Sequence, residues 1–472
     1  MASRFARVTP EHVRRLREAC GDAHVLVDRA DTEVYSHDET EDLQFWPEAV
    51  VRPGNAAEVS AILRLCHAEH LPVTPRGAGT GLSGGALPIH GGVVLSLARL
   101  DRILEIDEEN LMAVVEPGVI TQVLQETVEK RGLYYPPDPS SRGSCFLGGN
   151  VAHNAGGPRA LKYGVTKDFV YGLEAVLPTG ECIRTGGKLY KNVAGYNLTQ
   201  LITGSEGTLA VVTQIILKLV PLPRHKRTLL APFPDVRSAA RSVVRILHEK
   251  ITPAAVEFME QAAVQAAERK KGMKFPCGEA PALLLIEVDG MEAQVLDEQA
   301  GRIAEACMAE GAPDIFPADT PEKQKFLWDM RRCIGEAVKS LSTYKEEDTV
   351  VPRARLPELM DAIKEVRERW GIDAICYGHA GDGNIHVNIL KRDMSDTQWN
   401  EVLPHAIRDL FTRVVALGGT ITGEHGVGYV QRDYLPIAQG PVERRLMRQL
   451  KAAFDPHGIL NPGKIFPEEP AD

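Results

Sequence analysis

Two histidines seven positions apart, His379 and His386, are the side chains of this chain best spaced to hold one ligand together. Glycines between them allow the backbone to reverse direction, so both imidazoles can reach one point. Residues 385–390 then alternate apolar and polar side chains, which predicts a strand that buries one face and presents His386 and Asn388 on the other. Such a strand is typical of the wall of a polar binding site.

A carboxylate and a further histidine, Glu424 and His425, stand among the glycines of Gly423–Gly428. Residues 418–422 are expected to form a strand that runs into this glycine turn. Adjacent side chains of an extended chain point apart, so one can bind a metal while the other faces a second ligand. A lone histidine is more often a hydrogen-bonded core residue. Two histidines with one carboxylate, however, leave open coordination positions, as a catalytic metal requires.

A glycine-rich segment, Pro75–Gly85, contains Gly79, Gly81 and Gly84 at the spacing of a Rossmann fingerprint. That fingerprint works only where a helix opens at the glycines and its N-terminus meets the pyrophosphate. Here Pro88 and two further glycines follow and oppose a helix. The segment therefore predicts an irregular phosphate-binding loop rather than a Rossmann site.

Two more loop-rich tracts, residues 136–167 and 203–209, follow in the same half of the chain. Long loops inside a compact domain are usually functional. We therefore expect these tracts to belong to the same ligand site as the first loop.

The elements that must position these residues follow the hydrophobic periodicity. Helices are expected at residues 10–20, 56–70, 121–130, 237–250, 292–311, 321–340, 356–370 and 399–417, and strands at 93–97, 112–116, 171–176, 181–184, 210–220, 282–289, 374–377 and 385–390. Prolines clustered between positions 221 and 234 predict a domain boundary. The second half is expected to be an α+β block with an antiparallel sheet.

The composition narrows the class of protein. The chain has 472 residues, is 44% hydrophobic and carries a net charge of −10, which argues against nucleic acid as a partner. Apolar runs are too short to span a bilayer, and the N-terminus shows no secretion signal, so we expect a cytoplasmic protein. The eight cysteines form no Cys-x-x-Cys motif, which excludes an iron–sulfur cluster or a Cys-type zinc motif and fits reduced thiols.

Six motifs together resemble one family. They are Arg-Gly-Ala-Gly-Thr-Gly-Leu (76–82), Pro-Pro-Asp-Pro (136–139), Gly-Ser-Glu-Gly (204–207), Gly-His-x-Gly-Asp-Gly-Asn-x-His (378–386), Gly-Glu-His-Gly (423–426) and Asn-Pro-Gly-Lys (461–464). The chain thereby resembles the vanillyl-alcohol-oxidase-type FAD-binding superfamily over roughly residues 40–468. Within it, the match is to the FAD-linked D-2-hydroxyacid dehydrogenases, which include D-lactate dehydrogenases, the flavin subunit of glycolate oxidase and D-2-hydroxyglutarate dehydrogenase.

The resemblance implies an α+β fold in which a two-subdomain PCMH-type FAD-binding domain (1–225) precedes an α+β substrate or cap domain with an antiparallel sheet (226–420). A C-terminal segment (421–472) is expected to return to the flavin domain. FAD would be non-covalent, because the first loop lacks a histidine. The expected FAD contacts are Arg76, Gly77, Ala78, Gly79, Thr80, Gly81, Leu82, Pro137, Asp138, Ser141, Ser144, Gly149, Asn150, Asn154, Gly156, Glu206, Gly207, Glu424 and Asn461.

The resemblance also assigns roles in the second half of the chain. A divalent metal (zinc, manganese or iron) would lie on His379, His386 and Glu424. His425 would act as the base, and Asn388 would touch the substrate. An imidazole of near-neutral pKa suits a hydroxyl proton, and a bound metal lowers the pKa of that hydroxyl.

The substrate carboxylate calls for a cation. Arg331 is the expected clamp, because arginine binds carboxylates through two donors, and Arg332 is the competing candidate. Lys345 matches a family substrate lysine, although the acidic residues beside it could equally make a surface ion pair. The hydroxyglutarate enzymes carry a hydroxyl side chain four positions after the arginine, where this chain has Gly335, which favours a small monocarboxylate.

The expected activity is therefore FAD-dependent oxidation of a D-2-hydroxyacid, with D-lactate or glycolate favoured and D-2-hydroxyglutarate as the alternative. Two other hypotheses are a metal-dependent hydrolase with structural glycine loops, and a flavin subunit that only relays electrons. Electrons must leave to a separate quinone, electron-transfer flavoprotein, cytochrome or iron–sulfur subunit. This acceptor could hold the protein at a membrane surface, and a homodimer is a further expectation.

Overall fold

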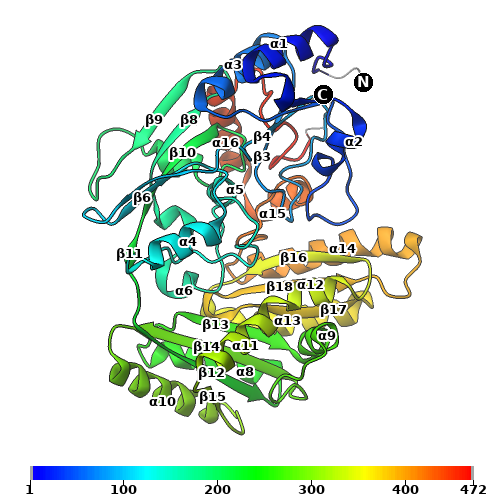
Figure 1. The fold of residues 1–472 in the computed structure, drawn as a ribbon. Helices are drawn as coiled ribbons and strands as arrows, with labels where there is room; N and C mark the ends of the chain where they lie inside the picture. The colour runs from blue at the N-terminus through cyan, green and yellow to red at the C-terminus, as the bar shows by residue number, and fades with distance from the viewer. Residues whose placement is uncertain (1–3, 469–472) are drawn as a thin grey trace. The chain divides into compact units, whose positions relative to one another are not determined.

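The chain folds into two compact units in a computed structural model that describes residues 4–468 (Figure 1). Unit 1 holds the chain up to Gly156, Val165–Leu222, and the chain from Glu424 onward. Unit 2 holds Gly157–Gly164 and Pro223–Gly423.

The unit boundaries differ from the expected ones in one substantial respect. The changes at 222/223 and 423/424 lie three residues from the expected positions, but Gly157–Gly164 was expected in the first domain and belongs to unit 2. Two ion pairs explain why Gly157–Gly164 belongs to unit 2. Arg159 lies 3.0 Å from Glu287, and Lys162 pairs with Asp289, and both acids belong to unit 2.

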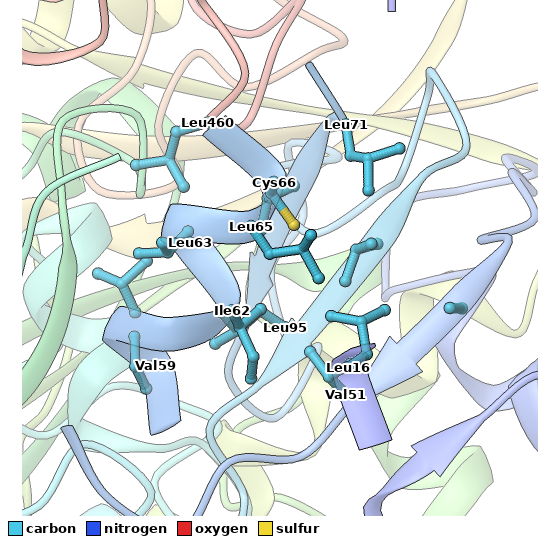
Figure 2. Close-up of a cluster of buried hydrophobic side chains, with 14 of the residues drawn as sticks. Leu16, Val51, Val59, Ile62, Leu63, Leu65, Cys66, Leu71, Leu95 and Leu460 are labelled. Carbon is cyan, nitrogen blue, oxygen red and sulfur yellow. The ribbon is translucent and has the colours of Figure 1, made fainter. Parts of the chain in front are cut away.

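The first sheet of unit 1 has four strands in the order β1-β2-β4-β3. They are β1 (Val25–Leu26), β2 (Ala49–Val51), β4 (Val93–Ser96) and β3 (Val73–Arg76), and the β2–β4 and β3–β4 pairs are parallel. Helices α1 (Pro10–Cys20) and α3 (Ala56–Ala68) pack on it, each with a side-chain N-cap, Thr9 and Asn55. Leu16, Ile62, Leu63 and Leu95 meet in its fully buried core (Figure 2).

The second sheet of unit 1 is antiparallel, in the order β5-β6-β10-β8-β9. Its strands are β5 (Ile103–Asp107), β6 (Met112–Val115), β10 (Val211–Lys218), β8 (Val170–Val176) and β9 (Cys182–Gly186). A two-stranded sheet pairs β7 (Leu133–Tyr134) with β11 (Val220–Pro221). Helices α4 (Thr121–Glu129), α5 (Leu147–His153) and α7 (Leu198–Ile202) lie in the connections.

The C-terminal segment contributes α15 (Leu435–Ala438) and α16 (Pro441–Phe454) to unit 1. After α16 the chain reaches the first sheet, where Leu460 makes a parallel bridge with Val73. The segment from residue 459 to 464 thereby lies beside the strand that leads into the glycine-rich loop.

Unit 2 is built on a seven-stranded sheet in the order β15-β12-β14-β13-β17-β18-β16, with every pair antiparallel. Its strands, green to yellow in Figure 1, are β12 (His225–Phe233), β13 (Ala255–Glu260), β14 (Ala282–Gly290), β15 (Phe316–Ala318), β16 (Tyr344–Val350), β17 (Asp373–His379) and β18 (Asn384–Leu390).

Two groups of helices pack with this sheet. One group is α9 (Gln261–Lys271), α11 (Pro321–Arg332) and α12 (Ile334–Lys339), which share a buried core with Leu283, Leu285 and Tyr377 of the strands. The other group is α8 (Val236–His248), α10 (Ala293–Ala309), α13 (Leu356–Trp370) and α14 (Asp396–Ala416). The short helix α6 (Ala160–Tyr163) also belongs to this unit.

Most expected elements are present, but three predictions on the second half were wrong or incomplete. Residues 418–422 form no strand and make a single bridge, Val350 to Thr420. The expected helix 321–340 is interrupted at Cys333. Strands β12, β13 and β16 were missed, because prolines and carboxylates interrupt their apolar pattern. Within residues 4–468, no helix is both long enough and apolar enough to cross a membrane.

Candidate active site

The two glycine-rich tracts of unit 1 meet at Gly77 and Gly149. A Cβ placed on Gly77 would lie 3.7 Å from the Cα and the N of Gly149, so the two backbones approach closely. Residues 77–82 are all partly exposed although their neighbours on either side are largely buried. A Cβ on Gly149 would meet nothing within 4 Å among the described residues. Backbone amide groups therefore border open space, as in a cradle for an anionic phosphate.

The first loop is held from behind by the side chain of Arg76. Its guanidinium donates to the Val34 carbonyl oxygen at 3.0 Å and lies over the Tyr35 ring, and burial lowers its pKa. Gly79 has φ +78°, and any Cβ there would meet the Arg76 guanidinium. The side chain of Arg76, an expected FAD contact, thus supports the loop, and its Nη1 atom makes no hydrogen bond within residues 4–468.

The C-terminal Asn-Pro-Gly-Lys motif fastens the same loop. Asn461 donates to the carbonyl oxygens of Gly85 and Glu206 at 3.0 and 2.9 Å. Lys464 donates to the carbonyl oxygens of Gly84 and Leu87 at 2.7 and 2.6 Å, and burial lowers its pKa to about 7. Asn461, an expected FAD contact, ties two loop segments together through its amide nitrogen, and its Oδ1 makes no hydrogen bond within residues 4–468.

The segment that carries His425 is held by two side chains of unit 1. Glu206, with φ +53°, accepts hydrogen bonds from the backbone N–H groups of Val427 and Gly428 at 2.9 and 2.6 Å. His153 contacts the His425 carbonyl oxygen through Nδ1 at 3.0 Å. His153 was not expected from the sequence, because it stands in an ordinary helix, α5.

Glu424 and His425 do not diverge as an extended chain would make them. The backbone bends here, and His425 Nε2 lies 4.0 Å from a Glu424 carboxylate oxygen. Both side chains are largely buried. The other Glu424 oxygen would be 2.7 Å from a Cβ on Gly156, so this glycine makes room for the carboxylate.

Several other expected FAD contacts of the second tract have their side chains engaged in holding the loop. Asp138 forms an ion pair with Arg142, Ser144 donates to the Ser141 carbonyl oxygen, and Asn150 donates to Thr121. The Lys167 backbone N–H donates to the Asn154 side chain, and the Gln125 side chain donates to the Pro137 carbonyl oxygen. Gly207 packs against the Pro75 ring.

One face of the unit 2 sheet carries a row of polar side chains. His386 stands opposite Tyr377 on one side and Asp348 on the other, and Asn388 stands opposite Glu346. Side chains of a strand alternate between faces, so all five lie on the same face.

The two histidines of this face meet as the sequence predicted. The His379 and His386 rings are 5.3 Å apart and nearly perpendicular, and both side chains are buried. The short turn Ala380–Asp382 joins their strands, and Gly383 has φ +77° with the Val351 carbonyl oxygen where a Cβ would be.

A buried carboxylate, Glu257, joins one of these histidines to Arg331. Its oxygens lie 2.9 and 3.0 Å from His379 Nδ1, and Oε2 lies 2.7 Å from an Arg331 Nη atom. Burial raises the pKa of Glu257, but its interactions with His379 and Arg331 outweigh this effect, so the pKa is lowered overall. Arg331 is 4% exposed and lies over the Tyr377 ring, whereas Arg332 lies over Trp328.

Another buried carboxylate, Asp348, anchors the end of unit 2. It accepts hydrogen bonds from Asn384, from the Thr422 hydroxyl and from the Gly423 backbone N–H at 2.7, 2.9 and 2.8 Å. Its Oδ1 is also 3.6 Å from His386 Nδ1. The chain therefore leaves unit 2 for Glu424 from a point fixed beside a candidate metal ligand.

The structure does not place Lys345 with the other substrate residues. Lys345 pairs in register with Ile389, so its side chain lies on the opposite face from Asn388. Glu346 takes the inward position, where its carboxylate lies 3.2 Å from Lys339 and 3.9 Å from His386 Nδ1. The register gives no support to a substrate role for Lys345, which stays a prediction.

Three buried polar atoms beside this face lack a hydrogen-bond partner within residues 4–468. Asn388 is fully buried, and neither polar atom of its amide makes a hydrogen bond within residues 4–468; the same holds for Arg331 Nε. Buried polar groups are nearly always hydrogen-bonded, so these atoms point to a bound ligand with both donor and acceptor groups.

The residues fit a divalent cation. With His379 Nδ1 occupied by Glu257, its Nε2 is the atom left for a metal, which is the usual arrangement of a metal-bound histidine. Glu257, Asp348 and Glu346 were all missed from the sequence. A signal existed for Glu257, since a carboxylate in the apolar run 254–259 is unusual in a buried strand.

Family models cover most of the chain. Residues 47–186 match the model described as FAD binding domain, and residues 222–465 match the one described as FAD linked oxidases, C-terminal domain. The first match includes the two glycine-rich tracts, and the second includes His379, His386, Arg331 and His425.

Curated relatives match over nearly their full length. The chain is 44% identical to the glycolate oxidase subunit GlcD of Bacillus subtilis, covering 92% of each chain. It is 37% identical to a D-lactate dehydrogenase of Anaerostipes hadrus, covering 98% of each. It is 34% identical to a D-2-hydroxyglutarate dehydrogenase of Stutzerimonas stutzeri, covering 97% of this chain and 99% of that one.

Solved structures confirm the expected fold. p-Cresol methylhydroxylase with substrate bound superposes with a TM-score of 0.80 at 18% identity, covering 97% of both chains. At this identity the likeness concerns the PCMH-type fold alone.

Proposed function

The chain belongs to the FAD-linked oxidases, an oxidoreductase family with an FAD-binding domain, and we propose a reaction for it within this family. The proposed reaction is the oxidation of a short D-2-hydroxy monocarboxylate, such as D-lactate or glycolate, to the 2-oxoacid. FAD supplies the two-electron oxidation when bound, and the exposed backbone of residues 77–82 and Gly149 would hold it non-covalently.

The substrate carboxylate is assigned to Arg331. This guanidinium is buried, is held on one side by Glu257, and has its Nε without a protein partner. A substrate carboxylate that accepts a hydrogen bond from this N–H group would form a buried charge-assisted hydrogen bond. Asn388, with both amide atoms unsatisfied, would complete the contact by donating to or accepting from the substrate.

The hydroxyl of the substrate is assigned to His425 and to a divalent metal on His379, His386 and Glu424. Zinc, manganese and iron all accept this set of two imidazoles and one carboxylate, and the metal would lower the pKa of the hydroxyl. His425 would accept the hydroxyl proton. Its backbone is held by His153, so the imidazole is carried on a fixed segment.

Two observations favour a monocarboxylate as the substrate. Glu346 stands directly opposite Asn388, so an anionic side chain lines the place where the far end of a longer substrate would lie. The Tyr377 hydroxyl lies 3.2 Å from where a Cβ on Gly335 would be, and it therefore occupies space beside the arginine. Both features oppose the second carboxylate of D-2-hydroxyglutarate.

The alternatives make different predictions for the purified protein. A metal-dependent hydrolase has no use for the FAD-binding domain, and a pure electron relay has no use for a buried Arg331 joined to His379 through Glu257. D-2-Hydroxyglutarate stays the competing substrate, since one relative at 34% identity carries that name.

The test is anaerobic flavin reduction in metal-replete protein. D-Lactate, glycolate and D-2-hydroxyglutarate are added in turn, and the loss of flavin absorbance is followed. We expect the monocarboxylates to bleach the flavin fastest. Faster bleaching by D-2-hydroxyglutarate would overturn the proposed substrate, and no bleaching by any of the three would overturn the proposed reaction. His425→Ala should keep FAD and lose bleaching.

The fate of the electrons is also part of the proposal. None of the eight cysteines belongs to a metal cluster or a disulfide in the described range, so we propose a separate acceptor: a quinone, an electron-transfer flavoprotein, a cytochrome or an iron–sulfur subunit. A cytoplasmic location, contact with a membrane through that acceptor, and a homodimer remain predictions.

A further inference from the structure

Glu257 is the one carboxylate in unit 2 that contacts both a candidate metal ligand and the candidate substrate clamp. It stands in the middle of β13 and is fully buried. His379 lies within 3.0 Å of both of its oxygens, and Arg331 lies 2.7 Å from Oε2.

The contact with His379 determines which ring nitrogen of this imidazole carries a proton. A carboxylate only accepts hydrogen bonds, so Nδ1 must carry the proton. The lone pair of a neutral imidazole is then on Nε2, which is the form that binds a metal. The negative charge of Glu257 also increases the basicity of the ring as a ligand.

The contact with Arg331 fixes the direction of the guanidinium. One Nη atom is held by Glu257 and the plane lies over the Tyr377 ring at 5.3 Å, which leaves Nε without a protein partner. The donor that faces a substrate carboxylate is thus selected by the same carboxylate that orients His379.

We propose that Glu257 is a positioning residue that sets the metal ligand and the carboxylate clamp together. Through it, the geometry of substrate binding and that of metal binding depend on one buried group. The inference rests on the proposed function and deepens it.

A second buried carboxylate on the same sheet face provides the comparison. Glu287 is also fully buried, and it accepts from the Trp328 indole N–H at 2.8 Å and pairs with Arg159 at 3.0 Å. Its hydrogen-bond and ion-pair partners within residues 4–468 are Thr228, Trp328 and Arg159, none of which is a candidate site residue. A merely structural role for Glu257 predicts that the two carboxylates respond alike to substitution.

The experiment compares Glu257→Gln with Glu287→Gln and Arg331→Met as FAD-loaded proteins. Zinc affinity is measured by competition with a chelator, and KM and kcat are measured for D-lactate. A glutamine has no charge and carries an NH2 donor in place of one acceptor oxygen, so its contacts with His379 and Arg331 are weaker. We expect Glu257→Gln to weaken zinc binding by about 10- to 100-fold, the usual effect of losing a partner of a metal-bound histidine, and to raise KM.

The two comparison variants separate the contacts. Arg331→Met should raise KM and leave zinc affinity near that of the wild type, and Glu287→Gln should change neither. Equal zinc affinity and KM in Glu257→Gln and Glu287→Gln would overturn the proposal.

A double variant covers the case in which Glu257→Gln does not fold because Arg331 is left as an unpaired buried charge. Glu257→Gln/Arg331→Met removes both charges, and its zinc affinity must then fall below that of Arg331→Met; equality overturns the proposal. If the wild type itself binds no zinc, manganese or iron, the metal part of the proposed function fails. If the wild type binds metal and the variant binds it equally well, only the role of Glu257 fails.

Discussion

Replacing Glu346 with glutamine should shift the substrate preference toward a dicarboxylate. Glu346 stands directly across the strand pair from Asn388, the proposed substrate contact. Side chains opposite each other in this way are separated by about 5 Å at Cβ. Two unit charges at about 5 Å interact by about 3 kcal/mol at an effective dielectric constant of about 20.

The expected effect is somewhat smaller than this limit. Lys339 lies 3.2 Å from the Glu346 carboxylate and offsets part of its field. Removing the carboxylate also leaves the lysine to attract an anion. We therefore expect the ratio of kcat/KM for D-2-hydroxyglutarate to that for D-lactate to rise by about 10- to 100-fold, since about 1.4 kcal/mol corresponds to a factor of ten.

The assay is steady-state oxidation of both substrates with an artificial electron acceptor. Metal content is measured in parallel, because Glu346 is 3.9 Å from His386 Nδ1. Glu347→Gln is the matched control: it is also buried on β16, but it pairs with Val387 and faces the other way. An unchanged ratio in Glu346→Gln, or an equal change in Glu347→Gln, would refute the assigned orientation of the substrate.

Three further predictions concern unit 1. Gly156→Ala should weaken metal binding, because the new Cβ would come within 2.7 Å of a Glu424 oxygen and displace it; unchanged metal content by elemental analysis would remove Glu424 from the ligand set. Asn461→Ala should release FAD more readily and lower the melting temperature, since two buried carbonyl groups lose their hydrogen-bond donor at a cost of about 1–3 kcal/mol each. A fluorescence titration of free FAD measures the affinity for FAD, and an affinity equal to that of the wild type would contradict this prediction. Burial lowers the pKa of Lys464 from 10.5 to about 7, so between these pH values the unfolded chain binds more protons than the folded one, and the free energy of unfolding should rise with pH from about 7 to 10. Lys464→Met should flatten this part of the curve of unfolding free energy against pH. An identical slope in the variant would count against the shifted pKa.

The residues on the polar face of the unit 2 sheet could be predicted from the sequence for β18 but not for β16. The alternation in residues 385–390 was sufficient to place His386 and Asn388 on one face, and the structure confirms it. Residues 344–350 were not recognised as a strand, because four consecutive charged side chains hide the alternation. The register of β16 against β18 was therefore unknown when Lys345 was predicted as a substrate contact.

The family and the proximity of His379 to His386 could be predicted from the sequence, because they depend on a local glycine turn and on motifs that are contiguous in the chain. The buried groups that contact these residues could not be predicted, because they come from distant parts of the chain. Glu257 and Arg331 are 74 positions apart and meet because β13 and α11 pack in one core. Long-range packing of this kind depends on the sum of many weak contacts, none of which leaves a local pattern in the sequence.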